Sequence, residues 1–275
     1  MLQAGCHLST SKGFSDTVKT AHSIGANTFA FFTRNPRGSK AKAEDPADAA
    51  RAMELMKQWE FGTLVAHGAY TMNLCTADPE GRDFAASLLE DDLRRMAMLP
   101  GQYYNFHPGS HVGQGTEQGI DHIVSALKRA LSHGYPVQVL LETMAGKGSE
   151  IGGRFEELKM ILDGVGNDQL GVCLDSCHVY DGGYDIVGDL EGVLEEFDRI
   201  IGLDRLKALH LNDSKNPFAS HKDRHDCIGT GSLGIETFRN IVCHPVLSKL
   251  PMILETPNEL PGYAREIQLL RELAR

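Results

Sequence analysis

The chain has 275 residues, 41% of them hydrophobic, and a net charge of -10 at pH 7 with neutral histidines. This length suits one α/β barrel, so we expect residues 1–275 to form a single domain. The acidic balance argues against a nucleic-acid partner, because phosphate binding usually leaves a basic surface. Bound metal cations would change that balance locally.

Short β-rich runs alternate with helix-length amphipathic segments along the chain. The predicted strands are Leu2–Cys6, Thr28–Phe32, Leu64–Ala66, Tyr104–Phe106, Val137–Leu141, Gly171–Leu174, Ala208–Leu211 and Met252–Leu254. The clearest predicted helices are Phe84–Leu99, Ile120–His133, Phe155–Asp163 and Leu190–Ile201. Eight β-then-α units favour a closed parallel (β/α)8 barrel, the TIM barrel of the α/β class. An open doubly wound sheet is the alternative, but the glycine-rich turn that usually follows its first strand is missing from Cys6–Ser9.

The apolar runs are strand-sized, far shorter than the roughly 20 residues that cross a bilayer. The first residues, Met1–Thr10, lack the basic start and apolar core of a signal peptide. The six cysteines are scattered, with no Cys-x-x-Cys pair. We therefore expect reduced thiols, no membrane partner and a cytoplasmic location.

Six consecutive predicted strands each end in a residue type that binds metals: His67, His107, Glu142, Asp175, His210 and Glu255. The carboxyl ends of parallel barrel strands share one rim, where active sites lie. A lone histidine at a strand end is more often structural than a ligand. Two glutamates on one rim, however, would repel each other unless a cation neutralised them. The pattern therefore predicts a metal-dependent hydrolase with its active site at the C-terminal rim.

Two closely spaced pairs extend this set. Asp175 and His178 face the same side if their segment turns helically. Asp223 and His225 lie close together on a loop, where a surface ion pair is the default interpretation. Carboxylate with imidazole suits zinc or manganese, and nine potential ligands are too many for one tetrahedral ion with an open position. Two or three metals fit this count. Cys173 fits a core residue, and the role of Cys177 stays open.

Several ordered motifs resemble the endonuclease IV family, the zinc-dependent apurinic/apyrimidinic endonucleases of base-excision repair. The similarity extends over essentially the whole chain, and the motifs that carry it are HPGSH (107–111), LET-x-AG (141–146), GVCLDSCH (171–178), HLNDSK (210–215), DRH (223–225) and LETP (254–257). The resemblance implies cleavage of duplex DNA 5′ to an abasic site, leaving a 3′-hydroxyl and a 5′-deoxyribose phosphate. It also implies trimming of blocked 3′ ends as a side activity, and we expect a monomer.

The resemblance further implies three Zn²⁺ ions per chain, with Mn²⁺ acceptable at one position. His67 and His107 would hold the first ion, and Glu142 would bridge it to the second. Asp175, His210 and Glu255 would complete the second site. The third ion would be held by His178, Asp223 and His225. Glu142 and Glu255 are the expected catalytic residues, with Glu255 orienting the nucleophile.

Two loop residues match family positions that distort DNA. Tyr70 matches a tyrosine that enters the duplex beside the abasic site. Arg37 is the expected inserting arginine, although Arg34 in the same loop stays an alternative. Three divalent ions and four ligand carboxylates would leave a formal charge of about +2. A basic rim would add to it through Arg37, Lys147, Arg154, Lys215, Lys222 and Arg224.

Two other classes compete with this interpretation. A sugar isomerase or epimerase of the xylose-isomerase-like barrels also places Glu, Asp and His around one or two divalent ions. The third ligand set, together with Tyr70, argues against it. A non-catalytic protein that kept the fold is the second rival, and the complete set of nine ligands argues against lost chemistry.

Overall fold

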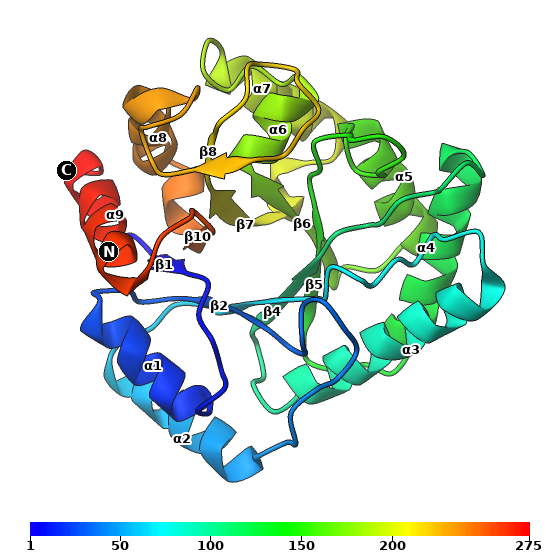
Figure 1. The fold of residues 1–275 in the computed structure, drawn as a ribbon, viewed down its shortest axis with the longest axis horizontal. Coiled ribbons are helices and arrows are strands. Elements are labelled where there is room, and N and C mark those ends of the chain that lie inside the picture. Colours follow the sequence, from blue (N-terminus) through cyan, green and yellow to red (C-terminus); the bar gives the residue numbers. More distant parts are fainter.

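Eight parallel strands form a barrel in the computed structural model, which describes residues 1–275. The strands are β1 (Ala4–Cys6), β2 (Ala30–Phe32), β3 (Val65–His67), β4 (Tyr103–Phe106), β5 (Gln138–Glu142), β6 (Leu170–Asp175), β7 (Leu206–Leu211) and β10 (Met252–Leu254). Their order is β1-β10-β7-β6-β5-β4-β3-β2. A parallel bridge between His7 and Ala30 joins β1 to β2 and closes the ring (Figure 1). The predicted barrel is confirmed.

Helices surround the strands (Figure 1). They are α1 (Phe14–Ser23), α2 (Pro46–Gln58), α3 (Pro79–Met96), α4 (Thr116–Leu131), α5 (Phe155–Val165), α6 (Ser176–Gly182), α7 (Leu190–Ile200), α8 (Gly234–Cys243) and α9 (Leu260–Leu273), with 3-10 turns η1 (Leu203–Arg205) and η2 (Leu247–Lys249). Helix α3 begins before its predicted start at Phe84, because Asp78 caps it by accepting a 3.0 Å hydrogen bond from the Gly81 backbone N–H. None of these helices combines the length and the hydrophobicity that a membrane-spanning segment requires.

The inward side chains of the barrel are stacked in layers, which places the polar residues. A small buried apolar layer consists of Ala30, Val65, Leu140, Cys173, Ala208 and Ile253. Side chains alternate along a strand, so the residue two positions later also points inward. Those residues are Phe32, His67, Glu142, Asp175, His210 and Glu255. The polar layer therefore lies directly above the small apolar one.

The ends of three strands differ from prediction. His67, Glu142 and Asp175 were expected just after their strands, but each is the last residue of its strand because it pairs with the neighbouring strand. His210 lies inside its predicted strand, and in β7 it pairs with Asp175. Four of the ligand-type residues, His67, Glu142, Asp175 and His210, are consequently part of the sheet, and Glu255 follows directly after β10.

The segment after β7 contains a small antiparallel ribbon that was not predicted. Its strands are β8 (Asp213–Ser214) and β9 (His225–Asp226), and Ser214 pairs with His225. This ribbon folds the long loop back over the barrel. It thereby returns Asp223 and His225 to the same rim as β6.

Candidate metal centre

Glu142 is the central residue of the rim and is fully buried. Its Oε2 lies 3.1 Å from His67 Nε2 and 3.5 Å from His107 Nε2. Its Oε1 lies 3.1 Å from His210 Nδ1 on the opposite side. Burial opposes ionisation, but the imidazoles of His210 and His107 hold the pKa of Glu142 well below its ordinary value. Glu142 is therefore a carboxylate whose two oxygens serve two different groups of donors.

The second group lies around His210. The Nδ1 of His210 is 3.2 Å from Glu255 Oε2 and 4.0 Å from Asp175 Oδ2. Ligand atoms of Glu142, Asp175, His210 and Glu255 all lie within 4.8 Å of one another. Three carboxylates this close repel one another unless a cation lies among them.

The third group joins α6 to the loop before β9. Asp223 Oδ1 lies 3.2 Å from His178 Nε2 and 3.4 Å from His225 Nε2. His225 Nε2 is also 3.8 Å from Asp175 Oδ2, so this group adjoins the second. Asp175 contributes to the turn itself, because its Oδ1 accepts the 2.9 Å hydrogen bond that caps α6 at His178. The expected helical turn after Asp175 is present.

The imidazole rings are oriented by backbone carbonyls. The Nδ1 atoms of His67, His178 and His225 donate to the carbonyls of Gly68 at 2.6 Å, Thr143 at 2.8 Å and Glu255 at 3.3 Å. This fixes the tautomer and leaves each Nε2 facing the carboxylates. His210 is reversed, since its Nδ1 faces the carboxylates. Fixed tautomers of this kind are typical of histidines that bind metals.

The donors present fit divalent metal ions. Three adjoining groups each combine imidazole nitrogen with carboxylate oxygen, the donor set that zinc takes. The buried His225 Nε2 has no hydrogen-bond partner, although it points at the third group. Burial lowers the pKa of His107 to about 4, which keeps its ring neutral and able to donate an electron pair. The nine residues predicted from the sequence are thus brought together in these three groups.

Several supporting residues were not predicted. Asn212 Nδ2 donates to Asp175 Oδ2 at 2.7 Å, while its Oδ1 accepts from the Glu255 backbone N–H at 2.9 Å. The buried Asp181 accepts from the Asp223 backbone N–H at 2.9 Å and so holds the loop of the third group. Their only sequence signal is proximity to ligand positions. His111 of the HPGSH motif lies outside the three groups and accepts a hydrogen bond from Gly115.

Known proteins are similar to this chain in length and in sequence. A relative named probable endonuclease 4, from Alkaliphilus oremlandii, is 58% identical over 276 residues, which cover 100% of this chain and 98% of the relative. The chain belongs to the endonuclease IV family. A relative with the same name from Akkermansia muciniphila is 58% identical and covers 98% of this chain and 97% of its own length. The model of the xylose isomerase-like TIM barrel family matches residues 18–273.

Solved structures place this endonuclease IV chain among the same barrels. Endonuclease IV from Thermus thermophilus superposes with a TM-score of 0.86 at 34% identity and covers 98% of each chain. D-psicose 3-epimerase from Clostridium cellulolyticum superposes with a TM-score of 0.68 at 12% identity, covering 100% of this chain and 98% of the epimerase. The second likeness concerns the fold alone.

The two loop residues expected to contact DNA differ from Arg34 in their surroundings. Tyr70 is 54% exposed, and its ring centroid lies 5.5 Å from that of His67 and 5.6 Å from that of His107. Arg37 is exposed on the loop after β2. Arg34 is buried instead, where its Nη2 lies 2.7 Å from Asp92 Oδ1 and 2.9 Å from Asp91 Oδ2. Arg34 is therefore occupied in holding the loop to α3.

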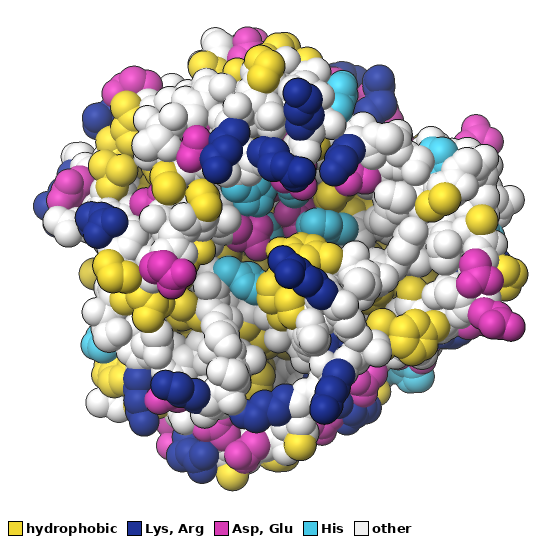
Figure 2. All heavy atoms as spheres, viewed as in Figure 1, with side chains coloured by type: hydrophobic (Ala, Val, Ile, Leu, Met, Phe, Trp, Pro, Cys, Tyr) yellow, Lys and Arg dark blue, Asp and Glu magenta, His cyan; other side chains and the backbone are white.

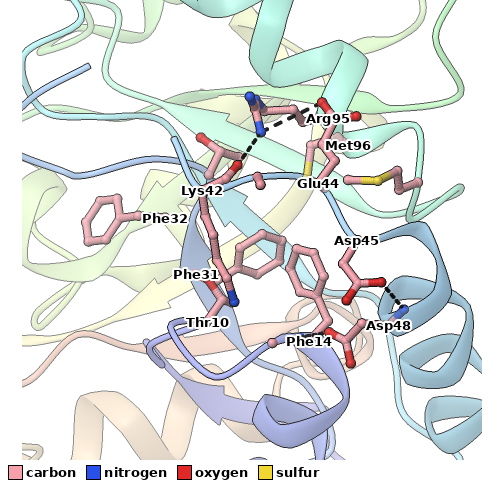
Figure 3. A pocket seen from close by; sticks show the side chains of 14 residues that line it. Thr10, Phe14, Phe31, Phe32, Lys42, Glu44, Asp45, Asp48, Arg95 and Met96 are labelled. Carbon is pink, nitrogen blue, oxygen red and sulfur yellow. Dashed lines mark hydrogen bonds and ion pairs between the residues drawn. The ribbon is translucent and has the colours of Figure 1, made fainter. Parts of the chain in front are cut away.

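The loop after β2 covers a small cavity (Figure 3). The cavity has a volume of about 70 Å³ and is lined on its apolar side by Phe14, Phe31 and Met96. Arg95 closes its edge by donating to the Lys42 carbonyl at 2.8 Å. Charged side chains on its wall are already paired, as Arg95 is with Glu44 and Asp91.

The surface around the metal centre is hollowed. Figure 2 shows histidine and acidic side chains inside the hollow and several lysine and arginine side chains along its edge. The basic residues expected there are all exposed: Arg37, Lys147, Arg154, Lys215, Lys222 and Arg224. Only some of them are tied down, as Arg224 donates to the Asp223 carbonyl at 3.0 Å. An acidic protein thus presents exposed cationic side chains near its candidate metal-binding residues.

Proposed function

We propose that this chain is a zinc-dependent endonuclease of base-excision repair that hydrolyses the phosphodiester bond 5′ to an abasic site in duplex DNA. The products would be a 3′-hydroxyl and a 5′-deoxyribose phosphate, and blocked 3′ ends would be trimmed as a side reaction. The observation that carries this proposal is the set of three adjoining donor groups, with the exposed Tyr70 beside His67 and His107 of the first. Membership of the endonuclease IV family supports it.

The residues present would hold three zinc ions, with manganese acceptable at one position. His67, His107 and Glu142 form one site, and Glu142 also joins the second with Asp175, His210 and Glu255. His178, Asp223 and His225 form the third. Bound ions of this kind lower the pKa of water, neutralise phosphate and stabilise a leaving oxygen.

Glu255 is placed to orient the attacking water. It is the only carboxylate of the second group that is partly exposed, whereas Glu142 and Asp175 are fully buried. Its Oε2 faces His210 at 3.2 Å, and its other oxygen is free to accept a hydrogen bond from water. Glu142 acts from below by keeping the histidines on both sides in place. Glu142 ends β5 and Glu255 follows directly after β10, positions from which they would align the nucleophile with the phosphate.

Recognition of the lesion would use the missing base. A nucleotide without a base costs less to bend or extrude, because little stacking is lost. The exposed ring of Tyr70 would occupy the vacated space, and Arg37 would enter from the neighbouring loop. The cationic edge of the hollow would hold the backbone phosphates.

The variant Glu255→Gln tests this assignment. It is expected to bind an abasic duplex as the unchanged protein does and to cut it at least a hundredfold more slowly. Glu259→Gln is the matched control, since Glu259 is exposed and lies outside the donor groups. If Glu255→Gln cuts at the normal rate, Glu255 has no catalytic role.

Measurements on the same metal-loaded protein distinguish the proposed function from two alternative functions. A sugar epimerase would bind one or two ions and convert a free ketose, whereas we expect three ions per chain and no sugar turnover. A non-catalytic protein would bind abasic DNA and leave it intact. We further propose that the chain acts as a monomer, which sedimentation of the metal-loaded protein tests.

A further inference from the structure

Asn105 lies on the barrel-interior side of the layer of ligand-type residues. It belongs to β4 and pairs with His67 on one side and with Leu140 on the other. Its side chain is fully buried. Its Nδ2 donates a 2.5 Å hydrogen bond to Glu142 Oε2, the oxygen that also faces His67. A neutral amide therefore supports the carboxylate that joins the first and second groups.

The other end of this amide has no partner. Asn105 Oδ1 is buried and accepts no hydrogen bond. A buried carbonyl oxygen without a partner costs stability, and an apolar side chain of the same shape would avoid that cost. Its partner on β5, Leu140, is apolar, whereas His67 on β3 is polar. The hydrogen bond that this asparagine makes through its side chain goes to Glu142.

The two oxygens of Glu142 face different residues only in one rotation of its carboxylate group. Oε2 faces His67 and His107, while Oε1 faces His210 and, at 3.4 Å, His178. Rotation about the last bond of the side chain would break this division. The Asn105 amide is a donor that approaches from the barrel interior, so it fixes the rotation and still leaves the upper side of Oε2 open.

We propose that Asn105 is a positioning residue that holds Glu142 in the orientation required to join two metal sites. This inference rests on the proposed metal-binding function. Hydrogen-bond partners behind metal-binding carboxylates typically change metal affinity by about 10- to 100-fold when they are removed. The third site does not include Glu142 as a ligand. His178 approaches Glu142 Oε1 to 3.4 Å, but through the Nδ1 that donates to the Thr143 carbonyl and not through the Nε2 that faces the third site, so the affinity of this site should change little.

The test is metal binding by Asn105→Leu in the full chain. Metal-stripped protein is titrated with zinc in competition with a chromophoric chelator. Two of the three bound ions should become about 10- to 100-fold weaker, and the third should keep its affinity. The melting temperature of the metal-stripped variant should stay close to that of the unchanged protein, because one lost hydrogen bond is offset by one removed orphan oxygen.

Gln102→Leu is the matched control. Gln102 is also a buried amide and lies just before β4 at the opposite end of the barrel, where its Oε1 accepts from the Leu64 backbone N–H at 2.7 Å. This variant should lower the melting temperature and leave all three zinc affinities unchanged. It therefore shows how a general loss of barrel stability affects zinc binding.

The outcomes are distinct. If Asn105→Leu binds all three ions normally, or loses all three equally, the inference is wrong while the proposed function stands. If the unchanged protein binds no zinc, the proposed function itself fails. Should Asn105→Leu not fold, Asn105→Ser replaces it, because serine is too short to reach Glu142 and leaves space instead of adding bulk. The same loss at two sites and not the third is expected.

Discussion

The backbone N–H of Tyr70 donates a 3.0 Å hydrogen bond to the carbonyl of Pro36. This bond joins the loop after β3 to the loop after β2, and Arg37 is the next residue along the second loop. The two side chains proposed to probe DNA therefore stand on linked loops. Arg34 holds the same unit to α3 through Asp91 and Asp92. Such preorganisation reduces the ordering that binding would otherwise require.

Replacing Tyr70 by alanine is expected to weaken binding of an abasic duplex. Loss of an aromatic ring that contacts bases costs about 1–3 kcal/mol, or roughly a 5- to 150-fold lower affinity. Fluorescence anisotropy with abasic and undamaged duplexes measures this change. Tyr70→Phe keeps the ring and is expected to bind normally. Equal affinities for Tyr70→Ala and the unchanged protein would remove Tyr70 from the DNA contacts.

The two arginines of the loop after β2 are expected to behave oppositely. Arg34→Ala leaves Asp92 buried without its partner and should lower the free energy of unfolding by about 3–5 kcal/mol. Arg37 is exposed, so Arg37→Ala should change the free energy of unfolding by no more than about 0.5 kcal/mol. It should nevertheless weaken the binding of abasic DNA. Urea unfolding and anisotropy together measure both effects. If Arg34→Ala is stable but binds DNA weakly, Arg34 and not Arg37 is the arginine that contacts DNA.

Acid should weaken the anchor of this loop. Burial alone would raise the pKa of Asp91, but hydrogen bonds from Arg95, Arg94 and Arg34 outweigh it and hold that pKa below its ordinary value. A depressed carboxyl pKa stabilises the fold above the unfolded-state pKa of about 3.9, and this stabilisation is lost as the pH falls below it. The stability difference between the unchanged protein and Asp91→Asn should therefore be constant from pH 5 to 7 and shrink toward pH 3. A difference independent of pH would contradict this assignment.

Metal removal should loosen the loop between β8 and β9. Ala219, His221 and Asp223 have φ angles of 56°, 52° and 56°, which non-glycine residues adopt at a cost. Hydrogen bonds to Asp181, to the Tyr180 carbonyl and to the Ala145 carbonyl hold parts of this loop, and the third metal site would add the ligands Asp223 and His225 to them. Lys215, Lys222 and Arg224 are exposed trypsin sites within it. Trypsin should cut here faster in the metal-stripped protein than in the zinc-loaded one, and equal rates would show that the metal does not order the loop.

Much of the fold follows from sequence pattern, because each strand and helix unit carries its own hydrophobic period. The rim was predictable for the same reason, since parallel strands bring their C-terminal residues to one face. The pairing of His67, Glu142 and Asp175 within the sheet was not, because residue type alone does not show where a ladder ends. Residue type also did not separate Arg34 from Arg37, as their difference arises from Asp91 and Asp92 far along the chain.

The inward position of the Asn105 side chain is predictable from the sequence. It lies two residues before His107, so strand alternation places both side chains on the inner side of the barrel. Asn212 and Asp181 are different, because their partners come from separate loops that only the fold brings together. Long-range hydrogen bonds of this kind leave no local pattern in the sequence.

The central claim is that the three donor groups cut DNA at an abasic site. The most direct measurement is incision of an end-labelled duplex containing one abasic site by the zinc-loaded protein, with the undamaged duplex alongside. We predict a single cut 5′ to the lesion, loss of cutting after metal removal and its return with zinc. An abasic duplex left intact by the fully zinc-loaded protein would contradict the account.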